Sequence, residues 1–226
     1  MSLADPTGEA WVFHIMVGLN QTGAVWAAQR VPDDHVAVVA NQFIIDKIDF
    51  SDTTNKNFYW SANLLEVART APELPVRLKG HSSDFSWKKY FARSVFDAEK
   101  RGSKVFAPVP MYGILRQWIV YRHTNQKLID SSVPIPVSSL TDFPFSIPKD
   151  DVKFSLLDVM NLKREVYADT AYDMRKGALA GPYGSPNRIE GSTDFGNHGQ
   201  TARAISIQRT TYGLVHVASP DLASDM

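Results

Sequence analysis

The amino-acid sequence predicts an α+β fold with an antiparallel sheet. Runs of β-branched and aromatic residues come first, apolar residues at helical spacing occupy the middle of the chain, and alternating runs return near its end. This order of strands, helices and strands favours an antiparallel sheet with helices packed on it over alternating β and α units. The chain has 226 residues, of which 44% are hydrophobic, so it is long and apolar enough to bury a core.

The first strands are expected in the N-terminal quarter of the chain. The runs 9–17 and 23–31 are rich in Val, Ile and aromatic residues and are separated by a Gly- and Asn-containing stretch, which predicts a hairpin. A Val-Pro-Asp-Asp turn at 31–34 leads into a third predicted strand at 35–43. Its portion 36–40 is apolar on both faces, which is typical of a strand buried between two layers.

Apolar periodicity predicts helices in the middle of the chain, at 63–69, 84–100, 112–121 and 155–168. The last of these begins with Ser155 and Asp158, whose spacing is that of a capping box. Prolines make 125–151 a long irregular loop, and a Gly- and Pro-rich excursion follows at 177–200.

The end of the chain predicts a second hairpin, from alternating runs at 202–208 and 211–218. We expect both groups of strands to form core sheets, with the helices at 84–100 and 155–168 covering them. The expectation requires three valines of the third strand to be buried, namely Val36, Val38 and Val39.

Composition limits the classes of partner and chemistry. Lys and Arg number 24 and Asp and Glu number 24, so there is no net charge to attract nucleic acid or an anionic membrane, and we expect neither as a partner. No apolar run approaches the roughly 18 residues of a membrane span, and the first residues lack the order of a signal peptide. The chain contains no cysteine, which excludes disulfides, thiolate metal sites and a thiol nucleophile carried by this chain.

Few residues suggest a site from spacing alone. The six histidines include no pair at the spacing of a helical metal site, and no phosphate-binding glycine motif is present, so we expect no metal and no cofactor. His14 and His216 lie within apolar runs and are interpreted as hydrogen-bonded core histidines. Asn41 ends the apolar third strand, where its carboxamide is a candidate donor for an oxyanion hole. By spacing alone, an asparagine that merely ends a strand is the simpler interpretation.

Several stretches together resemble one known family. They occur in the family's order and span most of the chain, although residues 69–109 fit less well. The matching stretches are EAWVFHI, WAAQRVPDDHVAVVANQF, NFYWSANLLEVA, PFSIPKDDVKFSLLDVMNLKREVYADTAYDMRKG, AGPYGSPNR and ARAISIQRTTYGLVH. The chain thus resembles the cysteine dipeptidases of the dipeptidase A type, related to secernins, among the N-terminal nucleophile hydrolases.

The resemblance implies an αββα sandwich with two antiparallel sheets, in an enzyme that hydrolyses dipeptides. In that family a cysteine at the start of the mature chain is the nucleophile and its own α-amino group is the base. Members are longer than this chain, which resembles their middle. We therefore interpret residues 1–3 as an added leader and residues 4–226 as the central part of one hydrolase domain, with the nucleophile-bearing N-terminal segment and the C-terminal part absent.

Three residues receive candidate roles. The resemblance supports Asn41 as the oxyanion donor. Arg116, in an Arg-x-Trp pattern, is a candidate cation that orients the nucleophile or pairs with the dipeptide carboxylate, and the simpler interpretation is a helix-surface arginine packed on Trp118. Arg30 ends a strand and is a candidate for a similar cationic role, and the simpler interpretation is a structural pair with Asp33 or Asp34.

The predicted function is therefore that of a segment of a dipeptidase, with a dipeptide as the substrate of the intact enzyme. By itself the chain is expected to be inactive and to self-associate, because a truncated sandwich leaves a sheet edge uncovered. Two alternatives stay open. One is another N-terminal nucleophile amide hydrolase of the bile-salt or penicillin-amide type, and the other is a non-catalytic α+β interaction domain. The sequence leaves the compartment undetermined.

Overall fold

The computed structural model divides the chain into two units, Met1–Ala107 with Ala218–Met226, and Pro108–Val217. Each unit is described by itself. The residues that the structure describes are 2–4, 9–17, 24–54, 56–66, 87–88, 111–127, 143–150, 154–180, 184, 203–207, 210 and 213–215.

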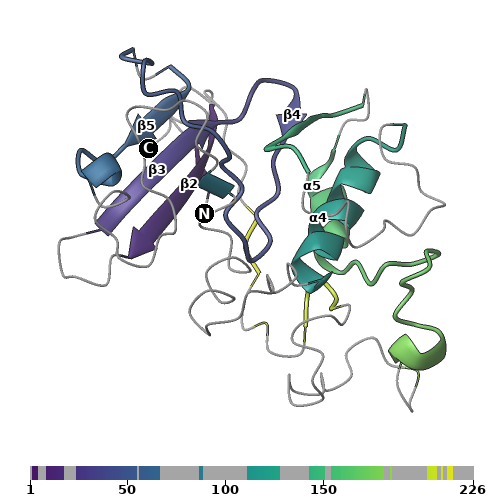
Figure 1. The fold of residues 1–226 in the computed structure, drawn as a ribbon. Helices are drawn as coiled ribbons and strands as arrows, with labels where there is room; N and C mark the ends of the chain where they lie inside the picture. The colour runs from purple at the N-terminus through teal and green to yellow at the C-terminus, as the bar shows by residue number, and fades with distance from the viewer. Residues whose placement is uncertain are drawn as a thin grey trace, which may run out of the picture. The chain divides into compact units, whose positions relative to one another are not determined.

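A four-stranded antiparallel sheet forms the first unit (Figure 1). In spatial order its strands are β1 (Ser2–Ala4), β2 (Ala10–Val17), β3 (Ala24–Arg30) and β5 (Phe58–Trp60). The central pair runs from Trp11 opposite Arg30 to Val17 opposite Ala24, which confirms the predicted N-terminal hairpin. Residues 2–4 pair with β2, and their interpretation as part of an added leader stays a prediction.

The predicted third strand is wrong beyond its first two residues. β4 covers only His35–Val36, and residues 37–43 form no strand. Asn41 has a φ of 59°, a left-handed conformation that interrupts an extended chain. Val39 is 42% exposed and Val36 and Val38 are only half-buried, so the expected burial of these valines is not observed. The buried apolar residues come later instead, at Phe43, Ile44, Ile45 and Ile48.

His14 links this later segment to the sheet. Its Nε2 accepts a hydrogen bond from the backbone N–H of Ile44 at 3.2 Å, and its ring stacks on Phe43 with centroids 4.3 Å apart. Burial lowers the pKa of His14 from 6.5 to about 4, so the ring is neutral at pH 7. The interpretation of His14 as a hydrogen-bonded core histidine is confirmed, whereas His216 lies outside the described residues.

The core of the second unit forms around α4 (Met111–Thr124), which confirms and extends the helix expected at 112–121 (Figure 1). Six of its residues are 1% exposed or less, namely Ile114, Leu115, Gln117, Trp118, Ile119 and Tyr121. Leu115, Trp118 and Ile119 cluster with three buried residues from later in the chain, Tyr167, Met174 and Ala204. The helix thus organises segments that are distant from it in sequence.

The helix α5 (Leu156–Lys163) has the capping box that the sequence predicts. The Asp158 backbone N–H donates to Ser155 Oγ at 3.2 Å, and the Ser155 N–H donates to Asp158 Oδ2 at 2.7 Å. The helix ends five residues before the expected position of 168, because the chain turns at Glu165 and adopts a left-handed conformation at Tyr167, with a φ of 61°. None of its residues is buried, so its expected role as a cover for a sheet is not observed.

Other expectations are met in part. Residues 64–66 and 87–88 are helical, and the rest of the helices predicted at 63–69 and 84–100 lies outside the described residues. The predicted loop 125–151 contains a short strand, β6 (Ile147–Pro148), and the excursion expected from 177 begins with a 3₁₀ turn, η2 (Gly177–Ala180). The described residues of the predicted C-terminal hairpin, 203–207, 210 and 213–215, contain no strand. At 203–205 the backbone groups bond instead to the side chains of Tyr167 and Arg116 and to the backbone of Glu165. The mixture of helices and antiparallel strands is compatible with the α+β class, and the αββα sandwich stays a prediction.

The lowered pKa of His14 predicts a specific dependence of stability on pH. Between pH 6.5 and pH 4 the unfolded chain binds a proton at this ring that the folded chain does not bind, so stability falls as the pH falls. From the shift to about 4 we expect a loss of about 3 kcal/mol from this group over that interval. Urea unfolding at pH 7 and pH 4.5 measures it. His14→Gln removes the titration, so the variant should lose less over the same interval, and an equal loss in both proteins would contradict the assignment.

Candidate functional site

The candidate site of the second unit begins with two residues on one face of α4. Tyr112 and Arg116 are four positions apart, which places their side chains on the same face of a helix. The Arg116 guanidinium carbon lies 5.7 Å from the centre of the Tyr112 ring. Nε and Nη2 of Arg116 both donate to the backbone carbonyl of Ala204, at 2.9 and 2.7 Å. Arg116 therefore binds α4 to a segment 88 residues further along the chain.

A second guanidinium lies beside the same ring. The Arg203 guanidinium carbon is 4.3 Å from the centre of the Tyr112 ring, within the range of a cation–π contact. The Tyr167 hydroxyl donates to the backbone carbonyl of Arg203 at 2.6 Å. Burial raises the pKa of Tyr167, so its hydroxyl keeps its proton and acts as a donor. The backbone carbonyls of residues 203 and 204 thus each accept a hydrogen bond from a side chain of the second unit.

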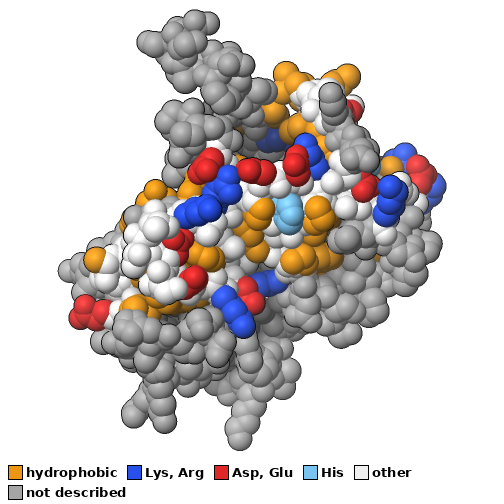
Figure 2. Space-filling view, turned by 90° about the horizontal axis from the view of Figure 1, so that it is seen from above, with side chains coloured by type: hydrophobic (Ala, Val, Ile, Leu, Met, Phe, Trp, Pro, Cys, Tyr) orange, Lys and Arg blue, Asp and Glu red, His pale blue; other side chains and the backbone are white. Residues whose placement is uncertain are grey.

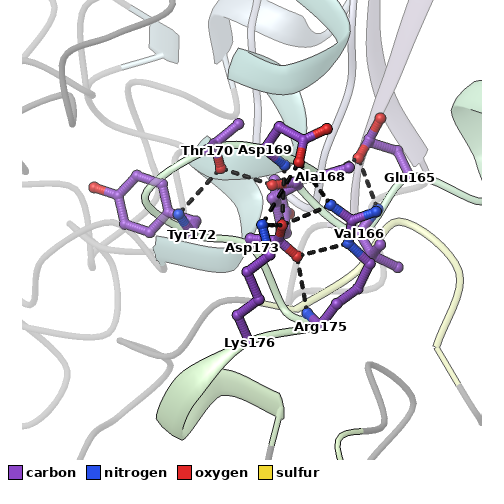
Figure 3. Close-up of polar contacts among 10 residues, drawn as sticks. Glu165, Val166, Ala168, Asp169, Thr170, Tyr172, Asp173, Arg175 and Lys176 are labelled. Atoms are coloured by element: carbon purple, nitrogen blue, oxygen red, sulfur yellow. Dashed lines mark hydrogen bonds and ion pairs between the residues drawn. The ribbon is translucent and has the colours of Figure 1, made fainter.

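Glu165 fixes a turn through the backbone of Val166 and Ala168 (Figure 3), and this turn contains Tyr167. Its Oε1 accepts hydrogen bonds from the backbone N–H groups of Val166 and Ala168, both at 2.9 Å, and its Oε2 lies 2.8 Å from His123 Nε2. Burial by itself would raise the pKa of Glu165, but the hydrogen bonds from His123 and the backbone outweigh it and hold the pKa below its ordinary value. The carboxylate is therefore charged at neutral pH and joins α4 to the turn.

The turn continues into an ion-pair cluster around Asp173 (Figure 3). Asp173 Oδ1 accepts from the backbone and Nε of Arg175, at 3.0 and 2.9 Å, and Oδ2 accepts from Arg175 Nη2 at 2.7 Å and from the Asp169 N–H at 3.0 Å. Lys176 Nζ lies 3.4 Å from Oδ2. The hydrogen bonds from Arg175 lower the pKa of Asp173, and Asp173 raises that of Arg175. The cluster orders the exposed end of the turn.

Asn41 belongs to the first unit, so its position is described apart from that of Arg116. It is exposed and has a φ of 59°. Asparagine adopts this left-handed conformation more readily than most residues, which gives the side chain a structural reason to be there. Its role as an oxyanion donor stays a prediction.

The predicted contacts of Arg116 and Arg30 have different outcomes. Arg116 lies over the Tyr112 ring and Arg122 lies over the Trp118 ring at 5.8 Å, and the packing of Arg116 on Trp118 stays a prediction. The catalytic role of Arg116 stays a prediction. Arg30 pairs with Asp33 at 2.8 Å, as predicted, and its Nε also lies 3.0 Å from Glu9, an ion pair without hydrogen-bond alignment.

Sequence reasoning from single residues missed Arg203, Glu165, Tyr167 and Asp173. All four lie in stretches that match the family, in REVYADTAYDMRKG and at the start of ARAISIQRT. The signal was therefore present in the matching stretches, but spacing alone assigns no contact between residues so far apart in the chain.

The chemistry offered by the described residues is that of cations and oriented backbone groups. Among them no group of three or more His, Cys, Asp or Glu side chains is arranged to hold a metal ion. Figure 2 shows acidic and basic side chains of the described residues interspersed on one face, in keeping with the balanced composition. Within the described part of the chain, no helix has the length and hydropathy of a membrane span. The guanidinium groups of Arg116 and Arg203 lie half-buried beside the Tyr112 ring.

Comparison with known proteins adds the family. Residues 1–220 match the model of a family described as peptidase family C69. Over 202 residues the chain is 30% identical to a protein of Latilactobacillus sakei described as a probable dipeptidase. That alignment covers 89% of this chain and 33% of the relative, so the chain spans about a third of that relative's length.

The contacts of Glu165 predict unequal effects for two substitutions. Glu165→Ala removes the acceptor of two backbone N–H groups and should lower the free energy of unfolding by roughly 2 kcal/mol. Glu165→Gln keeps a carbonyl acceptor and loses only the pair with His123, so it should cost less than about 1 kcal/mol. Urea unfolding at pH 7 compares the two, and equal losses would show that the backbone hydrogen bonds contribute nothing. Because the pKa of Glu165 is lowered, the stability that the wild type gains over Glu165→Gln from the charged carboxylate should be present above the ordinary value of 4.5 and be lost as the pH falls through the folded value.

Proposed function

The chain belongs to peptidase family C69, and on that premise we propose that it is part of a dipeptidase that cleaves the amide bond of dipeptides through a cysteine nucleophile outside these 226 residues. The family match confirms the resemblance that the sequence motifs indicate. The single observation that supports a dipeptide substrate is the likeness, over 89% of this chain, to a protein described as a probable dipeptidase.

The proposed reaction has two steps. The cysteine thiolate attacks the scissile carbonyl carbon, which forms a C–S bond and places negative charge on the carbonyl oxygen. The intermediate then expels the amine of the second amino acid, which leaves with the proton that the α-amino group took from the cysteine thiol. Water attacks the resulting thioester, releases the first amino acid as a carboxylate and restores the thiol. In this proposal the described residues supply charge stabilisation and substrate orientation and do not supply the nucleophile.

Two residues receive roles in the proposal. Asn41 donates its carboxamide N–H to the oxyanion, which requires an exposed side chain, as Asn41 has. Arg116 pairs with the substrate carboxylate. Its guanidinium is fixed at the Ala204 carbonyl, and a fixed cation loses less entropy when it binds an anion than a mobile one does.

Substitution of Asn41 separates the chemical role from the backbone role. In the intact enzyme, Asn41→Ala should lower kcat by roughly a hundredfold, as removal of one oxyanion donor does. The matched variant Asn41→Gly removes the same carboxamide but adopts a φ of 59° without strain. We expect both variants to lose activity to a similar extent in steady-state assays of dipeptide hydrolysis. Full activity in Asn41→Gly would show that the residue serves only the backbone conformation.

The isolated chain should hydrolyse no dipeptide, because it contains no cysteine and therefore no thiol nucleophile. The assay measures amino acids released from a panel of dipeptides by the purified chain, with the intact Latilactobacillus sakei relative as the positive control. Turnover by the chain that survives repurification and disappears in a point variant would refute the assignment of the nucleophile. Failure of the intact enzyme on every dipeptide, with turnover of other acyl amides, would refute the substrate class.

A further inference from the structure

We infer that the exposed apolar face of α5, formed by Leu156, Leu157 and Met160, packs against the part of the intact protein that lies outside these 226 residues. The inference rests on the proposed function, which places the nucleophile outside this chain, and it adds a surface at which the two parts of the protein meet.

The exposed apolar side chains of the second unit are concentrated at α5. Three of them are 48%, 61% and 40% exposed, namely Leu156, Leu157 and Met160. Leu214, which is 60% exposed, follows Gly213, and a Cβ atom at Gly213 would lie 3.8 Å from the Lys163 side chain at the end of the helix. Among the described residues of this unit, no other large hydrophobic side chain is exposed. Apolar residues that gather in one place mark a contact surface, whereas scattered ones do not.

The helix is apolar on two sides. Positions 156, 157 and 160 lie within about 100° of one another around the axis of an α-helix. Val159 and Leu162 lie on the other side and are half-buried. A helix with this pattern is typical of an element that is covered on both sides. In this chain none of its residues is buried, so the outer side lacks its cover.

Helix formation alone does not explain these apolar residues. The capping box of Ser155 and Asp158 already satisfies backbone groups of the first turn. Glu, Gln and Lys favour a helix about as much as Leu and Met do, and water solvates their side chains. Burial in the intact protein explains why three apolar residues occupy the exposed face instead.

Two observations favour the rest of the same polypeptide over a second copy of the chain. The alignment with the probable dipeptidase covers only 33% of that relative, so most of the relative's length lies outside the matched region. An interface between separate proteins takes roughly 20 residues on each side, and the exposed face with Leu214 offers four apolar side chains. So small a surface suffices within one polypeptide, because linked segments lose little translational freedom when they pack together.

Methionine oxidation in the intact protein measures the cover without any substitution. Met160 is 40% exposed in this chain and Met174 is 2% exposed, so an uncovered α5 predicts fast oxidation of Met160 beside slow oxidation of Met174. We expect instead that hydrogen peroxide oxidises both roughly tenfold more slowly than a free methionine peptide. Mass spectrometry of the tryptic peptides 154–163 and 165–175 measures the two rates. Rapid oxidation of Met160 beside a protected Met174 would overturn the inference.

A photo-crosslinking residue identifies what covers the face. With p-benzoylphenylalanine in place of Leu157, the intact protein should form crosslinks to residues of the same polypeptide that lie outside these 226. Mass spectrometry locates the crosslinked peptides. Crosslinks confined to these 226 residues, crosslinks that join two copies, or the absence of any crosslink would each contradict the proposed cover.

The matched variants are Leu157→Asp and Asn161→Asp, which add the same charge to one helix. A carboxylate is favoured in the first turn of a helix and disfavoured in the last, so an uncovered α5 predicts the larger loss of stability for Asn161→Asp. A covered apolar face predicts the reverse order, because Leu157→Asp places a charge against apolar groups. We expect Leu157→Asp to lower the midpoint of thermal unfolding by several degrees more than Asn161→Asp and to accelerate the oxidation of Met160. The order of an uncovered helix would refute the inference.

Dipeptide hydrolysis by the same preparations separates this inference from the proposed function. An intact protein that cleaves dipeptides while Met160 is rapidly oxidised keeps the proposed function and overturns the packing of α5. A protected Met160 in a protein that cleaves other acyl amides but no dipeptide supports the packing and overturns the proposed substrate.

Discussion

The carboxylate of Glu165 is the contact on which the second unit depends most. Glu165 joins three segments. Its carboxylate pairs with His123 on α4 and accepts the N–H groups of Val166 and Ala168 in the turn, and its backbone carbonyl accepts the N–H of Ile205 at 3.4 Å. A half-buried carboxylate is costly unless its oxygens are occupied. Here the hydrogen bonds to these oxygens stabilise the turn that contains Tyr167.

The turn at Glu165 also affects the position of residues 203 and 204. Tyr167, placed by the turn, holds the carbonyl of Arg203, and Arg116 holds that of Ala204. Arg116 therefore has a structural role whatever its chemical role. A guanidinium has five donors, and two of those of Arg116 are directed to the single carbonyl of Ala204.

In the first unit a neutral side chain, that of His14, joins a strand to a later segment of the chain. His14 is uncharged at pH 7 because burial lowers its pKa to about 4, and a neutral ring nitrogen accepts the N–H of Ile44. This bond ties β2 to the segment that follows Asn41. The position of Asn41 thus depends on a core histidine as well as on its own left-handed backbone.

The sequence by itself determined the local features: the β2–β3 hairpin, the helix α4, the capping box at Ser155 and the family. These depend on residues close together in the chain, so periodicity and spacing reveal them. Only the tertiary structure decided where β4 ends, why α5 stops at Lys163, and that Arg116 contacts Ala204 across 88 residues. The physical reason is that a backbone group keeps or loses its ladder partner according to which distant donor or acceptor the fold brings to it, and no local pattern encodes that choice.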